Sequence, residues 1–265
     1  MKKMRTLLRK GKIVDQNIVE EMKKYYWYHC IDLGNNIITD GDYDLRPLLS
    51  RYGFPADMRG MSVLDVGRGS GFFAFEFEKR GADVTATDIR SFFDWDFVGG
   101  EIEKEKRRTT VIDEVEFSRR EIWGAFEFAK EFKGSNVLGK FLNVYDISPA
   151  TLGRTFDLVF AGSITSHLRD PIRALECLHS VTRGMCIVCA PMIEIPKMES
   201  VPTMALVGTM DSDRRSWWVM NETCVVEMMK CANFKNIEVL SRIAIKNRRV
   251  KGLVVPHVVV RGYAD

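Results

Sequence analysis

The stretch Val63-Leu64-Asp65-Val66-Gly67-Arg68-Gly69-Ser70-Gly71 determines how this chain folds. A short apolar run enters three glycines at every second position, and a segment with helical character follows. Glycine has no Cβ and tolerates positive φ, so a turn of this composition can approach a ligand closely. The stretch therefore predicts a strand, a tight turn and a helix, with a nucleotide-like ligand at the turn.

An acidic residue completes this pattern. A second strand-like segment, 83–87, leads into Asp88, seventeen residues after Gly71. An acid at this place can accept hydrogen bonds from the two hydroxyls of a ribose. Together the two features predict a pocket for an adenosine-bearing cofactor, and they make an enzyme the leading interpretation. The predicted cofactor-binding residues of this region are Asp65, Gly67, Arg68, Gly69, Gly71, Asp88 and Ile89.

Strand-like and helix-like segments alternate from residue 61 onwards. Such alternation is typical of an α/β fold with a doubly wound, mostly parallel, Rossmann-like sheet. The predicted strands are 62–66, 83–87, 137–142, 156–160, 185–190, 236–244 and 253–261, and the predicted helices are 71–80, 171–181 and one that follows Asn221. The last two strands are joined by a hairpin and bring the sheet to seven strands.

Three regions lie outside this alternation. Residues 1–60 are expected to form an N-terminal helical cap, with a helix over 15–28, and residues 61–265 form the main domain. Insertions at about 92–135 and 191–220 emerge at the carboxyl ends of strands, where ligands bind in sheets of this kind. We expect the first to be helical cover and both to shape a substrate site.

The net charge and the length of the apolar runs argue against some classes of protein. The net charge is only +3 over 265 residues, so no strong nucleic-acid footprint is visible. Local basic clusters are either solvated charge or a phosphate-contacting surface. They consist of Lys2, Lys3, Arg5, Arg9, Lys10 and Lys12 near one end and Lys246, Arg248, Arg249 and Lys251 near the other. No apolar run reaches the length of a membrane span or a signal-peptide core.

Two cysteines have the spacing of a ligand pair but sit in an apolar run. Cys186 and Cys189 are three apart in a predicted strand, so their side chains point to opposite faces. This geometry is poor for one metal or one disulfide and favours buried, free thiols. We therefore expect a reduced, metal-free, cytoplasmic protein.

The glycine spacing resembles a known cofactor motif. Asp65, Gly67, Gly69 and Gly71 match motif I, E/D-x-G-x-G-x-G, of the class I S-adenosylmethionine-dependent methyltransferases. A dinucleotide fingerprint would instead require G-x-G-x-x-G, which disfavours a Rossmann oxidoreductase. The resemblance covers about residues 60–262 and implies that S-adenosylmethionine is the cofactor, with Asp88 at its ribose.

The same resemblance implies further site residues. Tyr145, Asp146 and Ile147 follow the third predicted strand, where side chains of these enzymes flank the adenine. Ser163 and His167 follow the fourth strand and would face the methyl group.

A narrower resemblance involves three other segments. They are Trp27 to Gly34, Gly71 to Glu76, and Trp217 to Asn221. These segments are similar to the group of methyltransferases related to the tRNA wobble-uridine (5-carboxymethoxyuridine) enzymes. Members of this group act on tRNA or on substrates that are untested, so the resemblance implies tRNA as one acceptor without fixing it.

Arg68 departs from the motif, because its loop position usually holds a small residue or cysteine. One interpretation is a salt bridge at the pocket rim. The other is bidentate pairing with a carboxylate of the cofactor. Since a cation is unfavourable beside a positive sulfonium, we expect the guanidinium to point away from the sulfur.

Histidines are the candidates for proton transfer if the acceptor is a hydroxyl. His167 lies just after the fourth strand, and His29 lies beside an aromatic cluster. Either one is a base or substrate contact, or else a packing residue. His179 and His257 fall inside a predicted helix and strand, so we expect them to be structural.

Aromatic pairs are candidates for substrate contact, because rings can stack on a base or a planar substrate. Trp27 and Tyr28 precede the core, and Trp217 and Trp218 end the second insertion. The alternative for all four is packing, which we favour for the preceding Tyr25 and Tyr26.

The acceptor stays open between two interpretations. The modest charge and the aromatic insertions favour a small molecule with a hydroxyl or amine, whereas the basic termini and the family resemblance favour a tRNA wobble uridine. A protein that keeps the fold as a catalytically inactive scaffold is the alternative from another class. The oligomeric state is not predicted.

Overall fold

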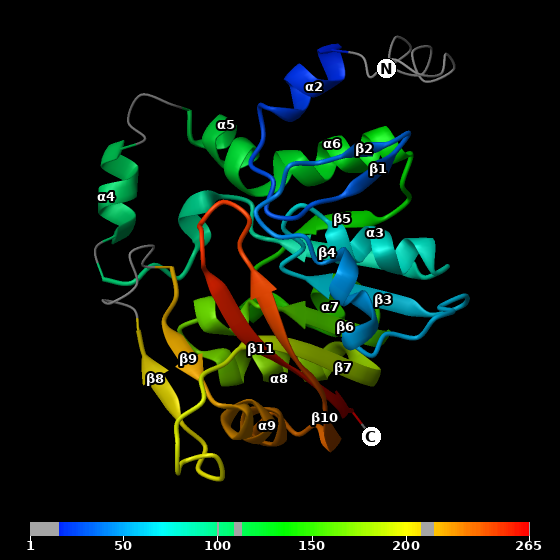
Figure 1. The fold of residues 1–265 in the computed structure, drawn as a ribbon. Coiled ribbons are helices and arrows are strands. Elements are labelled where there is room, and N and C mark those ends of the chain that lie inside the picture. Colours follow the sequence, from blue (N-terminus) through cyan, green and yellow to red (C-terminus); the bar gives the residue numbers. More distant parts are fainter. Residues whose placement is uncertain (1–15, 100, 109–112, 208–214, 265) are drawn as a thin grey trace.

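A seven-stranded sheet forms the centre of the molecule (Figure 1). The computed structural model describes residues 16–99, 101–108, 113–207 and 215–264. The sheet has the order β10-β11-β7-β6-β3-β4-β5. Its strands are β3 (Ser62–Val66), β4 (Asp83–Asp88), β5 (Leu138–Phe141), β6 (Phe156–Gly162), β7 (Thr182–Pro191), β10 (Lys235–Lys246) and β11 (Val254–Tyr263). Neighbours from β5 to β7 pair in parallel, and β11 pairs antiparallel with β7 and β10. The predicted doubly wound, mostly parallel fold is confirmed.

Helices bury both faces of this sheet. One face is covered by α3 (Phe72–Lys79) and α6 (Gly124–Lys133), and the other by α7 (Pro149–Leu152), α8 (Pro171–Val181) and α9 (Glu222–Cys231). Successive residues of a strand point to opposite faces, so Val63 joins the first core and Leu64 the second. All five residues of β3 are buried, as expected for a central parallel strand.

Local capping fixes where two of the predicted helices begin. Asp170 accepts a hydrogen bond from the backbone of Arg173 at the start of α8, and Pro171 occupies the first turn. Asn221 caps α9 by accepting from the backbone of Cys224. Both helices therefore begin where the sequence predicts.

The N-terminal region is less helical than expected. Its elements are α2 (Gln16–Met22), β1 (Asp32–Gly34), β2 (Ile37–Ile38) and the 3₁₀ turn η1 (Arg46–Arg51). The predicted helix over 15–28 ends at Met22, because a turn follows at residues 23 and 24 and the chain from Tyr25 to His29 then buries alternate side chains. Tyr25, Trp27 and His29 are buried, whereas Tyr26 and Tyr28 are half-buried. Because every second side chain is buried, the rings of Tyr25 and Trp27 join the hydrophobic core that also contains side chains of α3 and α6.

The insertions adopt regular structure over their described residues. The first contains η2 (Phe92–Asp94), α4 (Glu101–Arg108), α5 (Glu114–Ser118), the π-helical turn η3 (Arg119–Trp123) and all of α6. The second contains the antiparallel pair β8 (Met204–Leu206) and β9 (Trp218–Met220). Two short turns, η4 (Val144–Asp146) and η5 (Thr165–His167), follow β5 and β6. The expectation of helical cover for 92–135 is confirmed over the described part.

The paired cysteines behave as the strand pattern predicts. Cys186 and Cys189 are free and buried, and they belong to the cores on opposite faces of the sheet.

Among the described residues, no helix has both the length and the apolar character needed to cross a membrane.

An aromatic cluster provides a test of the core. Phe160 is fully buried, and its ring centroid lies 4.5 Å from that of Phe73. We expect Phe160→Ala to lower the free energy of unfolding by about 3–5 kcal/mol, because it leaves a cavity among fixed rings. Denaturant unfolding measures this, with Val115→Ala on the exposed side of α5 as the control. A loss below about 1 kcal/mol would contradict this packing.

Candidate cofactor and acceptor site

The glycine loop lies between β3 and α3 with a backbone that suits glycine. Gly67, Gly69 and Gly71 have φ values of 72°, 50° and 91°. A Cβ on Gly67 would lie 2.4 Å from Cγ2 of Ile164, and a Cβ on Gly71 would lie 2.6 Å from Cδ2 of Phe126. The loop is therefore packed closely on both sides, and its main chain is held in a left-handed conformation that other residues rarely adopt.

Asp88 is joined to this loop by its side chain. One carboxylate oxygen accepts a hydrogen bond from the backbone N–H of Gly69 at 2.9 Å, and the other accepts from the N–H of Ile89 at 2.8 Å. Burial raises the pKa of Asp88, while the charge of Arg68 and these two hydrogen bonds lower it. The strand end thus presents a carboxylate of fixed orientation beside the turn, as the sequence predicts.

Asp65 is the most isolated charge of the site. It is only 2% exposed, and its Oδ2 has no hydrogen-bond partner within the described part of the chain. Burial and the neighbouring charge of Asp88 raise the pKa of Asp65 to about 7, and a backbone N–H from Ala74 opposes this shift. An unpartnered, buried carboxylate oxygen is costly, so this atom suits a donor or a cation supplied by a ligand.

Arg68 does not occupy either position expected from the sequence. Its side chain is 2% exposed, and Nη1 donates to the carbonyl oxygen of Lys140 at 3.0 Å and that of Ala86 at 3.4 Å. The predicted rim salt bridge is therefore wrong, because the guanidinium lies inside the fold. Direct pairing with a carboxylate of the cofactor is likewise not supported by this buried position.

The end of β6 forms the opposite wall. Ser163 has a φ of 59°, and its N–H donates to the carbonyl of Cys189 at 2.7 Å. In η5, Thr165 is 1% exposed, and its hydroxyl has no partner in the described residues. His167 Nδ1 lies 3.0 Å from the carbonyl oxygen of Arg215. Since a carbonyl only accepts, the neutral imidazole carries its proton on Nδ1 and its lone pair on Nε2.

Tryptophans from both insertions meet over η5. The ring of Trp95 stands perpendicular to that of His167, with centroids 5.1 Å apart. The indole N–H of Trp217 donates to the carbonyl of Asp96 at 2.5 Å, and that of Trp218 donates to the carbonyl of Leu168 at 3.1 Å. Both insertions therefore reach the carboxyl ends of the strands, and both Trp217 and Trp218 make hydrogen bonds there.

Asp96 connects these segments, and sequence reasoning missed it. Its Oδ2 accepts from the hydroxyl of Tyr145 at 2.8 Å and from the backbone N–H of Arg169 at 2.9 Å. The turn after β5, the turn before α8 and both insertions thus meet at one half-buried residue. An aspartate within an insertion that contains many charges gives no sequence signal of this role.

The predicted adenine-flanking residues differ in exposure. Tyr145 is half-buried, and its hydroxyl also accepts from the N–H of Asp170 at 3.0 Å. Asp146 is exposed, whereas Ile147 is 2% exposed within the core below the turn. Of the three side chains, that of Tyr145 connects directly to the rest of the site.

The N-terminal aromatic segment approaches the glycine loop from the other side. The N–H of Tyr28 donates to the hydroxyl of Ser70 at 2.9 Å. His29 packs on Phe72 and Phe73, and burial lowers its pKa to about 3, so its ring is neutral at physiological pH. Its Nδ1 has no partner in the described residues.

Trp27 lies in the core. It is 5% exposed, its ring packs edge-on against Phe128, and its N–H donates to the carbonyl of Met22 at 2.9 Å. The prediction that Trp27 contacts substrate is therefore not supported, whereas Tyr28 keeps a half-buried ring beside the loop.

The other two histidines pack within a helix and a strand. His179 stands perpendicular to the ring of Phe234, and His257 is buried in β11 with its pKa lowered to about 4 by burial. Both positions agree with the structural roles predicted for them.

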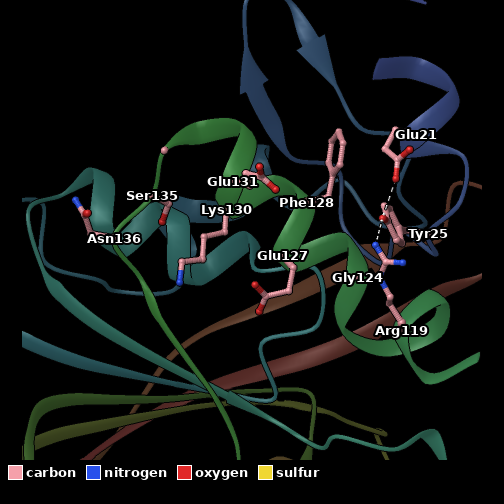
Figure 2. Close-up of a pocket in the computed structure, with 11 residues that line it drawn as sticks. Glu21, Tyr25, Arg119, Gly124, Glu127, Phe128, Lys130, Glu131, Ser135 and Asn136 are labelled. Carbon is pink, nitrogen blue, oxygen red and sulfur yellow. Dashed lines mark hydrogen bonds between the residues drawn. The ribbon is translucent and has the colours of Figure 1, made fainter. Parts of the chain in front are cut away.

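A separate groove lies between α2 and α6 (Figure 2). Tyr25 joins its two sides, since its hydroxyl donates to Glu21 at 3.1 Å and accepts from Arg119 at 2.8 Å. The lining is Glu21, Tyr25, Arg119, Gly124, Glu127, Phe128, Lys130, Glu131, Gly134, Ser135 and Asn136. None of these is a predicted site residue, so this groove is distinct from the predicted cofactor site at the carboxyl ends of the strands.

Asp65 generates a prediction on pH. Its pKa is higher in the folded protein than in the unfolded chain, so the folded state binds more protons and stability falls as pH rises from about 4 through 7. Asp65→Asn removes this dependence. We compare the free energy of unfolding of the variant with that of wild type at each pH. We expect this difference to rise in favour of the variant by at least about 2 kcal/mol from pH 4.5 to pH 8, since one pKa unit corresponds to about 1.4 kcal/mol. Urea unfolding across this range measures it, and a difference that is independent of pH would contradict the burial of this charge.

Comparisons with known proteins agree with this fold. A family model described as a methyltransferase domain matches residues 38–239. The N-terminal domain of EvdMO1, crystallised with SAH (S-adenosylhomocysteine) and D-fucose, superposes with a TM-score of 0.58 at 16% identity, over 96% of this chain and 98% of that one. The YcgJ protein from Bacillus subtilis gives a TM-score of 0.51 at 12% identity, over 83% of this chain and 97% of that one.

At these identities the structural likeness shows a common fold alone. Among curated proteins, no sequence matches this chain significantly. The family model, however, spans well over half of the chain and includes the glycine loop, Asp88 and η5. The chain therefore belongs to the methyltransferase domain family.

Proposed function

We propose that this protein transfers a methyl group from S-adenosylmethionine to a hydroxyl or amine of a small molecule. The observation that carries the proposal is the pairing of Asp88 with the backbone of Gly69, at 2.9 Å, in a loop held at positive φ. This pairing fixes a carboxylate beside a glycine turn, where it can accept hydrogen bonds from the ribose of an adenosyl group.

The residues present fit this cofactor. Asp88 would accept the ribose hydroxyls, the main chain from Gly67 to Gly71 would line the methionine portion, and the half-buried Tyr145 would lie at the adenine side. The unpartnered Oδ2 of Asp65 supports the assignment, because the methionine portion carries an ammonium group. The EvdMO1 domain with a similar fold was crystallised with SAH, which also supports it.

The chain's own contribution is alignment and exclusion of water. A sulfonium supplies an already activated methyl group, so the protein has to orient the acceptor against it. His167 is our candidate base for a hydroxyl acceptor, because its Nδ1 proton is held by the carbonyl of Arg215 and its lone pair is then on Nε2. Trp95 packs against His167, and Trp217 and Trp218 donate to the carbonyls of Ser166 and Leu168 on either side of it. In this proposal the three rings would enclose the acceptor, with Ser163 at the methyl group.

A small-molecule acceptor is favoured over tRNA by the ion pairs of two arginines in the C-terminal basic cluster. Arg248 pairs with Asp40 at 2.8 Å, and Arg249 pairs with Asp42 at 2.5 Å. These two arginines therefore bind the N-terminal region of the same chain instead of presenting free charge to phosphates. The basic residues from Lys2 to Lys12 lie outside the described residues.

Asp88 tests the cofactor assignment. We expect Asp88→Ala to weaken binding of S-adenosylhomocysteine by at least about tenfold, which corresponds to about 1.4 kcal/mol, because the ribose hydroxyls lose their acceptor. Isothermal titration calorimetry measures this. Asp83→Ala, at the exposed opposite end of the same strand, is the matched control and should bind as wild type. Unchanged affinity in Asp88→Ala would refute the ribose assignment.

Salt dependence tests the acceptor class. If the acceptor is a small molecule, bulk tRNA should not bind saturably below about 10 µM at 50 mM salt, whereas neutralising several phosphates would give binding that weakens steeply between 50 and 200 mM. Fluorescence anisotropy with labelled tRNA measures this. Tight binding with a steep salt dependence would favour the tRNA wobble-uridine interpretation instead.

A further inference from the structure

His29 is a buried histidine with one unused ring nitrogen. The residue is 6% exposed, and its Nδ1 has no hydrogen-bond partner among the residues that the structure describes. Its ring packs on Phe72 and Phe73, with centroids 5.7 Å and 5.9 Å away, and stands perpendicular to the ring of Tyr28 at 4.7 Å. An apolar ring would fill this place without the cost of an unsatisfied polar atom, so the free nitrogen indicates a ligand.

The edge of the ring that carries Nδ1 faces the glycine loop. A Cβ on Gly69 would lie 3.7 Å from Cε1 of His29 and 3.9 Å from its Nδ1, and these two are the nearest atoms to it. The N–H of the same glycine donates to Asp88 at 2.9 Å. The unused nitrogen therefore lies beside the loop residue that binds the carboxylate proposed for the ribose.

Backbone contacts fix the position of His29. Its carbonyl oxygen accepts from the hydroxyl of Thr39 at 3.0 Å, and the preceding Tyr28 donates its N–H to the hydroxyl of Ser70 in the loop at 2.9 Å. A Cβ on Gly41 would collide with the backbone of His29, so the chain after β2 packs directly against it. The imidazole is thus held next to the loop before any ligand binds.

A neutral donor at this place suits a carboxylate. Burial lowers the pKa of His29 to about 3, so the ring is uncharged at physiological pH and is a poor base. A neutral imidazole carries its proton on one of its two nitrogens, and from Nδ1 it can donate. The cation of the loop, Arg68, directs its Nη1 to the carbonyls of Ala86 and Lys140. His29 can therefore bind a carboxylate without adding positive charge beside a sulfonium.

We propose that His29 is a further cofactor-binding residue, whose Nδ1–H donates to the carboxylate of the methionine portion. This inference rests on the proposed function, because S-adenosylmethionine is taken as the cofactor and the glycine loop as the place of its methionine portion. The ammonium group of that portion is assigned to the unpartnered Oδ2 of Asp65. The carboxylate is then held from the N-terminal segment and the ammonium group from β3.

A pair of ligands isolates this contact. S-Adenosylhomocysteine carries the carboxylate, whereas S-adenosyl-3-thiopropylamine lacks it and keeps the ammonium group. Isothermal titration calorimetry gives the affinity for each, and the ratio of the two affinities measures the preference for the carboxylate. We expect His29→Phe to lower this ratio at least about tenfold relative to wild type, because a hydrogen bond to a charged group is lost. Affinity for the amine alone should change by less than about threefold.

Two further variants of His29 support this measurement. In His29→Asn the amide lies as far from Cβ as Nδ1 does, so a donor is kept and the ratio should stay within about threefold of wild type. His29→Leu also removes the nitrogen and replaces His29→Phe if that variant does not fold.

His179 offers a matched control. Its Nε2 is likewise buried and has no partner within the described part of the chain, and its ring stands perpendicular to that of Phe234 at 5.0 Å. It lies in the last turn of α8, on the other face of the sheet from α3. His179→Phe should leave the preference for the carboxylate unchanged.

The outcomes separate the inference from the proposed function. If His29→Phe keeps the wild-type ratio, the inference is overturned and the proposed function stands, and this includes an equal weakening of both ligands, which reduces His29 to packing. A ratio in His29→Asn as low as in His29→Phe would contradict donation from Nδ1. A wild-type protein that binds both ligands equally also overturns the inference alone. A wild-type protein that binds neither ligand overturns both.

Discussion

Buried charge at the carboxyl ends of β3 and β4 is the constraint on which the site depends. Two carboxylates, Asp65 and Asp88, lie beside a turn whose main chain is held at positive φ, and both have raised pKa values because burial disfavours their ionised forms. Such an arrangement is stable only where donors and cations compensate it. Gly69 and Ile89 supply N–H groups to Asp88, and the positive charge of Arg68 opposes the effect of burial on its pKa. The remaining oxygen of Asp65 has no partner in the described residues, and under the proposed function it would accept from the ammonium group of the cofactor.

The rest of the molecule closes around this edge of the sheet. The N-terminal segment reaches the loop through the hydrogen bond between Tyr28 and Ser70, and both insertions reach the opposite wall through Asp96. Their hydrogen bonds join segments that are far apart in sequence. Trp95 packs against His167, and Trp217 and Trp218 donate to the carbonyls of the neighbouring Ser166 and Leu168. We propose a small acceptor and not a polyanion for this edge of the sheet, because Arg248 and Arg249 pair with acidic residues of the same chain.

Features encoded by local sequence were predicted well. The strand–glycine–helix stretch, the acid at Asp88, the caps of α8 and α9 and the seven-stranded sheet depend on short-range patterns, so composition and spacing suffice. Features that depend on packing between distant parts of the chain were not predicted from the sequence. The direction of Arg68 depends on Phe126 and Lys140, which come much later in the chain, and the burial of Trp27 depends on Phe128. Asp96 has no local signal, because its three partners come from three different segments.

A crystal structure with S-adenosylhomocysteine bound tests the central claim most directly. The account predicts that the two ribose hydroxyls lie within hydrogen-bond distance of the Asp88 carboxylate and that the homocysteine portion follows the main chain from Gly67 to Gly71. A ligand bound elsewhere, or an Asp88 side chain directed away from the sugar, would contradict it.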